Sequence, residues 1–251
     1  MASDCRSVRI VTKLDVCWAM DYSRCMKYPE LLAGLREIGD SVTLRKKSHV
    51  AFQGEVPRYG YYVLDGAVKA YFISSEGIQT IVDIYAKHSM LPMGWLSRSS
   101  TTALFYYEAI TDVRAVRFRR DDFENLLETD ADVHKSYTNY LAATHAASLF
   151  RANGLCQPHA SHKVCYALYF LVSRYGVEQS DGEYMIPIPL THEIIASFIG
   201  QSRENTAKTI KKLSDDGIIQ YASKTYVVRT TLLEHYLGED GFRELVASSL
   251  S

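Results

Sequence analysis

The stretch Leu190–Leu213, LTHEIIASFIGQSRENTAKTIKKL, has the pattern of two short helices joined by a tight turn. Thr191 can cap a first helix, Gly200 can supply the left-handed residue that ends it, and Ser202 can cap a second. Apolar residues recur three or four apart on one face of each helix: Ile194, Ile195, Phe198 and Ile199, then Ala207, Ile210 and Leu213. The stretch predicts a helix-turn-helix motif.

The segments around this motif predict a winged helix. Asp216-Gly217 can end the second helix, and residues 218–221 and 225–228 have the composition of two strands around a turn at Ser223-Lys224. Before the motif, the pattern predicts a helix over 161–175, a polar turn over 178–183 and a strand over 184–188.

The second helix of the motif begins with side chains that can reach base edges in a major groove. Arg203 can offer two donors to guanine, Glu204 can accept from the cytosine amino group, and Asn205 can pair with adenine. Other cations and hydroxyls nearby can contact phosphates. The residues expected to contact DNA are Thr191, His192, Ser202, Arg203, Glu204, Asn205, Lys208, Lys211, Lys212 and Lys224.

The region from Ser41 to Phe123 consists of short segments rich in β-branched and aromatic residues, with glycine or Asp-Gly at the breaks. Several short strands at nearly regular spacing predict a compact antiparallel roll. The expected strands cover 50–52, 61–64, 68–73, 80–85, 104–110 and 113–118.

A long helix is predicted between these two regions. Asp121 and Asp122 can begin a short helix, and Asp130 or Asp132 can then cap a long one that contains no proline. One apolar face lasts for several turns, which predicts a two-fold dimer seam; a helix buried in the core of its own chain is the alternative. The residues assigned to the seam are Val133, Tyr137, Tyr140, Thr144 and Ala147.

The sequence resembles the Crp/Fnr superfamily of bacterial transcription regulators. The resemblance covers 44–228 and is carried by Gly200–Glu204 with Lys208, by 61–69 and by the long helix. It implies an α+β fold with an N-terminal antiparallel β-roll, a long dimerisation helix and a C-terminal winged helix-turn-helix. The expected divisions are 1–128, 129–157 and 158–251. It further implies a homodimer on a two-fold symmetric DNA operator, an effector sensed in the roll, and RNA polymerase as a partner if the protein activates.

One departure from this family concerns its cyclic-nucleotide site, which has Gly-Glu followed by Arg-Ser or Arg-Thr. The chain has Lys87–Trp95 and then Thr102–Phe105, without the arginine or the carboxylate. A phosphate without a cationic partner loses much affinity, so no response to cyclic AMP is expected. A small organic effector, aromatic or other, is predicted instead; packing of the roll's own core is the alternative for these side chains. The pocket residues expected are Tyr85, Met90, Met93, Trp95, Tyr106, Tyr137, Tyr140 and Thr144.

Three sensor alternatives involve metals or thiols. An iron–sulfur cluster is not expected, because Cys5, Cys17 and Cys25 are widely spaced and the roll has no cysteine. Haem could use His88 with Met90 or Met93, although no cofactor or metal is expected. Cys156 and Cys165 lie on either side of the hinge between the long helix and the C-terminal region, and they could act as a redox switch.

Composition restricts the function further. Among 251 residues, 28 Lys plus Arg stand against 29 Asp plus Glu, a net charge of -1, which excludes a histone-like polycation but permits a locally basic face. No apolar run spans a membrane and no secretion signal begins the chain, so a cytoplasmic location is expected. The chain has no glycine-rich phosphate loop, and Ala196 stands where a zinc-protease helix has its second histidine. An enzyme is not expected; a winged-helix module that binds protein is the remaining alternative.

Overall fold

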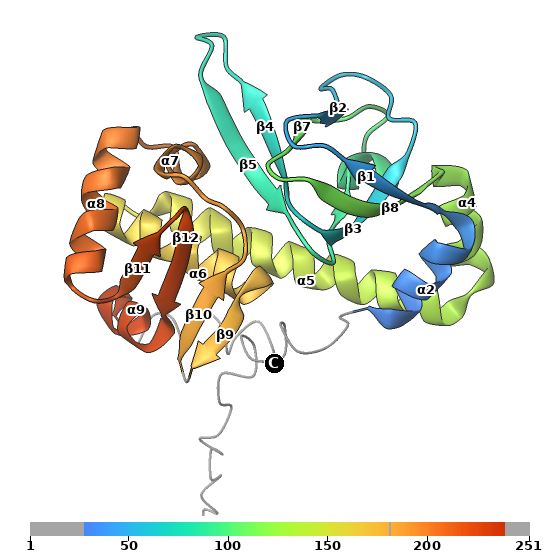
Figure 1. Cartoon of the computed structure of the whole chain (residues 1–251). Coiled ribbons are helices and arrows are strands. Elements are labelled where there is room, and N and C mark those ends of the chain that lie inside the picture. The colour runs from blue at the N-terminus through green and yellow to red at the C-terminus, as the bar shows by residue number, and fades with distance from the viewer. Residues whose placement is uncertain (1–27, 181, 239–251) are drawn as a thin grey trace, which may run out of the picture.

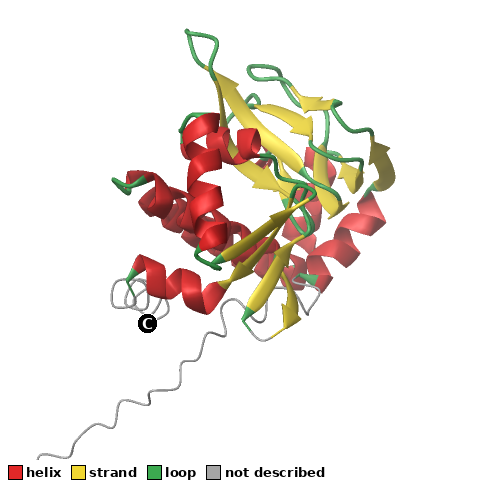
Figure 2. Cartoon of the chain, turned by 60° about the vertical axis from the view of Figure 1, so that its left-hand side comes forward, coloured by secondary structure: helices red, strands yellow, loops and turns green. Residues whose placement is uncertain are grey.

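The computed structural model describes residues 28–180 and 182–238, which form a β-roll, a long central helix and a winged helix (Figure 1). Figure 2 shows that strands make up most of the roll, whereas helices gather in the C-terminal part and along the roll. The predicted α+β architecture is confirmed. Within the described ranges, no helix is both long and apolar enough to cross a membrane.

The roll consists of two four-stranded antiparallel sheets, ordered β1-β8-β3-β6 and β2-β7-β4-β5. Side chains from both sheets share one core cluster between them. The strands are β1 (Asp40–Leu44), β2 (His49–Ala51), β3 (Gly60–Asp65), β4 (Val68–Ile73), β5 (Gln79–Tyr85), β6 (Met90–Leu91), β7 (Tyr106–Ala109) and β8 (Val113–Phe118). Helices α2 (Pro29–Ile38) and α3 (Met93–Leu96) flank them.

The predicted strands all occur, with ends shifted by a few residues, but the roll also contains two that the sequence did not predict. Strand β1 pairs with β8 along its whole length, and β6 contributes only two residues. Strand β1 lies at a sheet edge and none of its residues is fully buried, so its apolar pattern is weak. The Asp65-Gly66 break is a turn with Gly66 at φ +85°, where a Cβ would lie 2.2 Å from the carbonyl oxygen of Asp112.

The interior of the roll is filled. Val63 and Val68 are fully buried on facing strands, and the rings of Tyr85 and Tyr107 lie with centroids 5.9 Å apart. These two tyrosines are only 7 % and 2 % exposed. Burial raises the pKa of both phenols. Their rings occupy the space between the sheets.

Two helices follow the roll, α4 (Arg120–Thr129) and α5 (Ala131–Cys156). The Asp130 carboxylate caps α5 by accepting hydrogen bonds from the backbone N–H groups of Asp132 and Val133, each at 3.0 Å. Of the two caps that the sequence allowed, Asp130 is therefore the one used. Helix α5 extends from the roll to the winged helix and contacts both (Figure 1).

The apolar face of α5 does not form the free dimer seam that the sequence predicted. Val133, Tyr137 and Tyr140 are buried in a cluster with α2, β6 and α4, and Ala147 is buried with α6. Thr144 lines a cavity inside the chain. The alternative, a helix packed in the core of its own chain, is correct for this face, because the roll and α2 cover it. Another face of α5 remains exposed.

The C-terminal part begins with α6 (Ala160–Tyr175), which packs on α5 where Gly154 meets Tyr166. A Cβ on Gly154 would lie 2.6 Å from the Tyr166 Cβ, so this crossing requires glycine. The predicted polar turn is partly wrong: its first residues belong to β9, which pairs with β10. The remaining elements are β9 (Val177–Ser180), β10 (Glu183–Ile186), α7 (His192–Ile199), α8 (Arg203–Asp215), β11 (Ile219–Ala222), β12 (Thr225–Arg229) and α9 (Thr230–Leu237), with the sheet order β11-β12-β10-β9.

Candidate nucleic-acid interface and domain junction

The turn between α7 and α8 is held by the residues that the sequence assigned to it. The Thr191 hydroxyl accepts a hydrogen bond from the Ile194 N–H at 3.2 Å, and the Ser202 hydroxyl accepts from the Asn205 N–H at 3.2 Å. Gly200 ends α7 at φ +65°, ψ +43°, the left-handed conformation that glycine adopts without strain. Both helices are therefore capped, and the short turn sets the angle at which α8 leaves α7.

The start of α8 presents polar side chains to solvent. Arg203, Glu204, Asn205 and Lys208 are all exposed, whereas Ile210 is buried against the rest of the winged helix. Within residues 28–180 and 182–238, no acidic side chain pairs with the α8 cations. This face of α8 thus presents unpaired cations and an amide together with the Glu204 carboxylate. Further exposed residues that were predicted to contact DNA are Ser202, Lys211, Lys212 and, in the wing turn, Lys224.

Two residues that were predicted to contact DNA also make contacts within the chain. The hydroxyl of Thr191 caps α7, and the ring of His192 lies 4.5 Å from that of Tyr221 in the wing. The His192 Nε2 atom is buried and has no hydrogen-bond partner among the described residues. Burial, and secondarily the charge of Arg203, lower the pKa of His192. The structure therefore packs the His192 ring on the wing and buries its Nε2 atom.

Most of the predicted pocket residues are packed in cores. Met90, Trp95, Tyr137 and Tyr140 belong to the cluster beneath α2, and Tyr85 belongs to the interior of the roll. Met93 packs against both clusters, and Tyr106 stacks on Tyr71 at 5.3 Å outside the roll interior. The structure therefore does not bring the eight residues together, since Tyr140 and Thr144 alone among them line the cavity described next.

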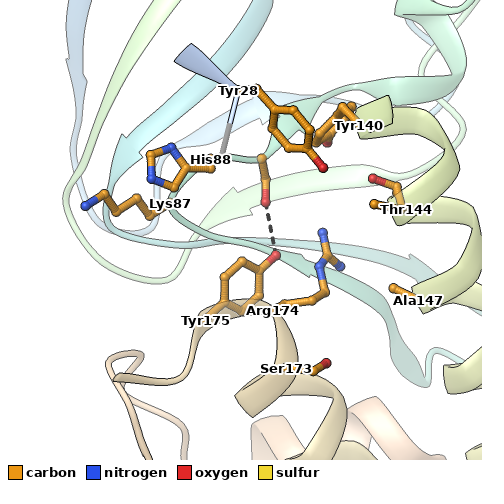
Figure 3. Close-up of a pocket in the computed structure, with 11 residues that line it drawn as sticks. Tyr28, Lys87, His88, Tyr140, Thr144, Ala147, Ser173, Arg174 and Tyr175 are labelled. Carbon is orange, nitrogen blue, oxygen red and sulfur yellow. Dashed lines mark hydrogen bonds between the residues drawn. The ribbon is translucent and has the colours of Figure 1, made fainter. Parts of the chain in front are cut away.

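A cavity lies where the β5–β6 turn, α5 and the C-terminal end of α6 meet (Figure 3). Its volume is about 30 Å³. The lining combines apolar surface with several polar groups, and Figure 3 shows the Arg174 guanidinium pointing toward the hydroxyls of Tyr28 and Thr144. The hydroxyls of Ser89 and Tyr175 share a hydrogen bond of 3.0 Å at its edge. We call this space the junction cavity.

Arg174 is the principal charge at the junction cavity. Its side chain is only 10 % exposed, and its Nη1 donates to both carboxylate oxygens of Asp83, at 3.0 and 3.2 Å. Burial lowers the pKa of Arg174, but Tyr175 and Asp83 raise it by more, so its pKa lies above the ordinary value. The guanidinium stays charged.

Strand β5 is also bonded to the winged helix through its backbone. The Ser197 hydroxyl on α7 donates to Gln79 O at 2.9 Å and accepts from Ile81 N at 3.2 Å. From the end of α5, Arg151 Nη2 donates to Ile81 O at 3.0 Å and to Phe198 O at 2.9 Å. We call these contacts, with the Asp83–Arg174 pair, the β5 junction. No local pattern in the sequence predicts this junction, because its contacts join residues 47 to 118 positions apart.

The metal and thiol alternatives rest on residues in different settings. His88 Nδ1 shares a hydrogen bond of 3.1 Å with the Tyr62 hydroxyl, and Met90 is fully buried. Cys165 is buried, which raises the pKa of its thiol to about 12, whereas Cys156 is exposed. Cys5, Cys17 and Cys25 lie outside the described residues. No group of three histidine, cysteine or acidic side chains is gathered for a metal in the part of the chain that the structure describes.

Comparison with known proteins gives the same division of the chain as its geometry. The family described as a cyclic nucleotide-binding domain matches residues 41–130, and the Crp-like helix-turn-helix domain matches residues 162–236. The first match covers the roll and the second covers the winged helix.

Individual relatives span nearly the whole chain. The CRP-like cAMP-activated global transcriptional regulator of Mycobacterium tuberculosis is 23 % identical over 80 % of this chain and 88 % of the relative. The global nitrogen regulator of Synechocystis is 23 % identical over 83 % and 95 %. Among solved structures, FixK2 from Bradyrhizobium japonicum aligns with a TM-score of 0.68 and 21 % identity, over 80 % of this chain and 97 % of that one. The chain belongs to the Crp/Fnr superfamily and is a DNA-binding transcription regulator of that type.

Proposed function

We propose that the protein is a homodimer that binds a two-fold symmetric operator under the control of a small effector other than cyclic AMP. The observation that carries this proposal is the capped, exposed start of α8, with Arg203 as its first residue. RNA polymerase becomes a further partner if the bound protein activates. A cytoplasmic location, where the operator is accessible, follows from the same role.

The chemistry at the start of α8 suits base recognition. Arg203 presents two parallel donors that match guanine O6 and N7, Glu204 accepts from a cytosine amino group, and Asn205 matches adenine. Lys208 follows one turn later on the exposed side. The ends of α8 and the wing supply cations for phosphates, which position the helix without specifying sequence.

The exposed face of α5 supplies the dimer surface. Six exposed residues recur with alternating spacings of four and three, the period of a coiled-coil seam. Most of them are small or apolar, and Leu149 keeps 59 % of its surface exposed. We name this row the seam stripe: Thr138, Ala142, His145, Leu149, Ala152 and Cys156. Pairing two copies along it would bury Leu149 and present the two α8 helices to successive major grooves, about 34 Å apart.

The interior of the roll supports an effector other than cyclic AMP. Tyr85 and Tyr107 occupy the space between the sheets, and neither carries the charge that a buried phosphate needs. A nucleotide would have to displace both rings from a packed core. The roll therefore serves as a structural partner of α5 and α6 in this proposal.

The test is selection of binding sites from a random duplex library, followed by titration of the selected site. A two-fold symmetric site is expected, with affinity that falls steeply as salt rises. Arg203→Ala should weaken binding by about 1–3 kcal/mol and relax one position of the site. Arg58→Ala, an exposed arginine of the roll, is the matched control and should leave affinity unchanged. Unchanged DNA affinity in Arg203→Ala would favour a winged helix that binds protein.

A further inference from the structure

We infer that the junction cavity is the effector site, and that it binds a small anion, a carboxylate or an inorganic oxyanion, on the free edge of Arg174. This inference rests on the proposed function, because it names the ligand class and the place from which the ligand acts.

Arg174 has hydrogen-bond donors that no acceptor among the described residues uses. Asp83 takes hydrogen bonds from Nη1 alone, and within residues 28–180 and 182–238 no acceptor is bonded to Nε or Nη2. Nε and Nη2 form the side edge of the guanidinium, which binds the two oxygens of a carboxylate in parallel. A nine-tenths buried cation with this edge facing a cavity is under-supplied with acceptors. An anion would complete it.

The surroundings select a small anion. The volume of about 30 Å³ corresponds to two or three water-sized groups, enough for one carboxylate or a planar oxyanion. The Tyr28 hydroxyl has no hydrogen-bond partner among the described residues and points toward the same space as Arg174. Thr144 adds a second hydroxyl from α5. Asp83 balances the charge of Arg174, and the exposed Lys87 at the rim directs its amine away from the cavity in Figure 3.

The position of the junction cavity connects it to DNA binding. Its walls come from the roll, from α5, which carries the seam stripe, and from α6 of the winged helix. The guanidinium of Arg174 would contact the anion on one edge and Asp83 of β5 on another. A bound anion would therefore change the position or strength of the Asp83–Arg174 pair in the β5 junction. A ligand at this place changes operator affinity if it binds the two domain arrangements unequally, and the operator then changes ligand affinity by the same factor.

The experiment is isothermal titration of the full chain with sodium acetate, sodium nitrate and sodium phosphate, each against chloride at equal ionic strength. Saturable binding of one anion per chain is expected for at least one probe, and the probe that binds separates a carboxylate from an inorganic source. Arg174→Lys, which loses the paired edge, should weaken binding about tenfold or more. Tyr28→Phe and Thr144→Val should weaken it severalfold.

Ser173→Ala is the matched control. Ser173 lines the cavity, but its hydroxyl already donates to Phe170 O at 2.9 Å and has no proton left for an anion, so binding should be unchanged. If Arg174→Lys does not fold, Tyr28→Phe, which keeps the ring, decides the matter. No saturable binding of any probe, or equal binding in Tyr28→Phe and Ser173→Ala, would overturn the inference.

Titration of the selected operator with and without the bound anion separates this inference from the proposed function. Operator binding without anion binding would support the proposed function and refute the anion site. Anion binding without operator binding does the reverse. A change in operator affinity that disappears in Tyr28→Phe supports both.

Discussion

Asp83 on β5 and Arg174 on α6 form the buried ion pair that joins the roll to the winged helix, with Nη1 3.0 and 3.2 Å from the two carboxylate oxygens. The two side chains are 16 % and 10 % exposed. They come from positions 91 residues apart, and each belongs to a different matched domain. The junction between the roll and the winged helix therefore combines one buried ion pair, the hydrogen bonds beside it, and the apolar cluster that Ile81 and Ile84 share with Phe198.

Breaking this pair should cost far more than breaking an exposed one. Asp83→Asn leaves a nine-tenths buried guanidinium without its counter-charge, so we expect the free energy of unfolding to fall by about 3 kcal/mol. Asp65→Asn, whose partner Arg114 is 67 % exposed, is the control and should cost less than about 1 kcal/mol. Urea denaturation followed by circular dichroism measures both. Equal losses would show that the junction pair contributes no more than a surface pair.

If two chains pair along the seam stripe, Leu149 should be the side chain that contributes most to dimer stability. Leu149→Glu places a carboxylate at the centre of the proposed seam, and sedimentation should then give half the mass of the wild type. Leu232→Glu, at another exposed leucine on α9, is the matched control and should remain dimeric. A dimeric Leu149→Glu would place the interface elsewhere on the chain.

Cys156 gives an independent measure of the same seam, because it lies on the stripe and is exposed. In a variant with Cys5, Cys17 and Cys25 changed to serine, a short bis-maleimide should join two chains through Cys156, since Cys165 is buried. Cys156→Ser should abolish the cross-link. Cross-linking that survives this change would contradict a pairing that brings the two Cys156 residues of the seam stripes together.

Cyclic AMP should not bind. The interior of the roll is filled by Tyr85 and Tyr107, and the segment after β5 lacks the arginine and the carboxylate of the family's nucleotide site. Calorimetric titration with cyclic AMP should therefore give only heats of dilution. Saturable binding at micromolar concentration would show that the two rings move apart and would refute the proposal.

His192 predicts a loss of stability in mild acid. Burial lowers the pKa of its ring below the ordinary value of about 6.5, so the folded chain favours the neutral form. The stabilisation is present above the unfolded pKa and is lost as the pH falls below about 6.5 through the folded value. We expect a larger drop in melting temperature between about pH 7.5 and about pH 5 for the wild type than for His192→Gln. Equal drops would assign the acid sensitivity to other groups.

Local chemistry in the sequence was enough to predict most elements of the molecule, with β1, β6 and β9 among the exceptions. The helix-turn-helix follows from Thr191, Gly200 and Ser202, each of which acts on hydrogen bonds or backbone angles within three residues of itself. The roll follows from β-branched segments punctuated by glycine, and α5 follows from an unbroken 3.6-residue period. The exposure of Arg203, Asn205 and Lys208 on α8 follows from the helical period as well.

Long-range packing determines which element covers each apolar surface. The period of α5 shows that one face is buried, but it does not distinguish a second chain from α2 and the roll, which bury Tyr137 and Tyr140. The aromatic side chains that were predicted to line a pocket fill hydrophobic cores instead. The hydrophobic effect is non-directional, so an apolar sequence pattern does not show whether a side chain faces a core or a pocket. The cavity beside Arg174 arises where Tyr28, residues 87–89, residues 140–147 and residues 173–175 converge, and contacts between such distant segments leave no periodic trace in the chain.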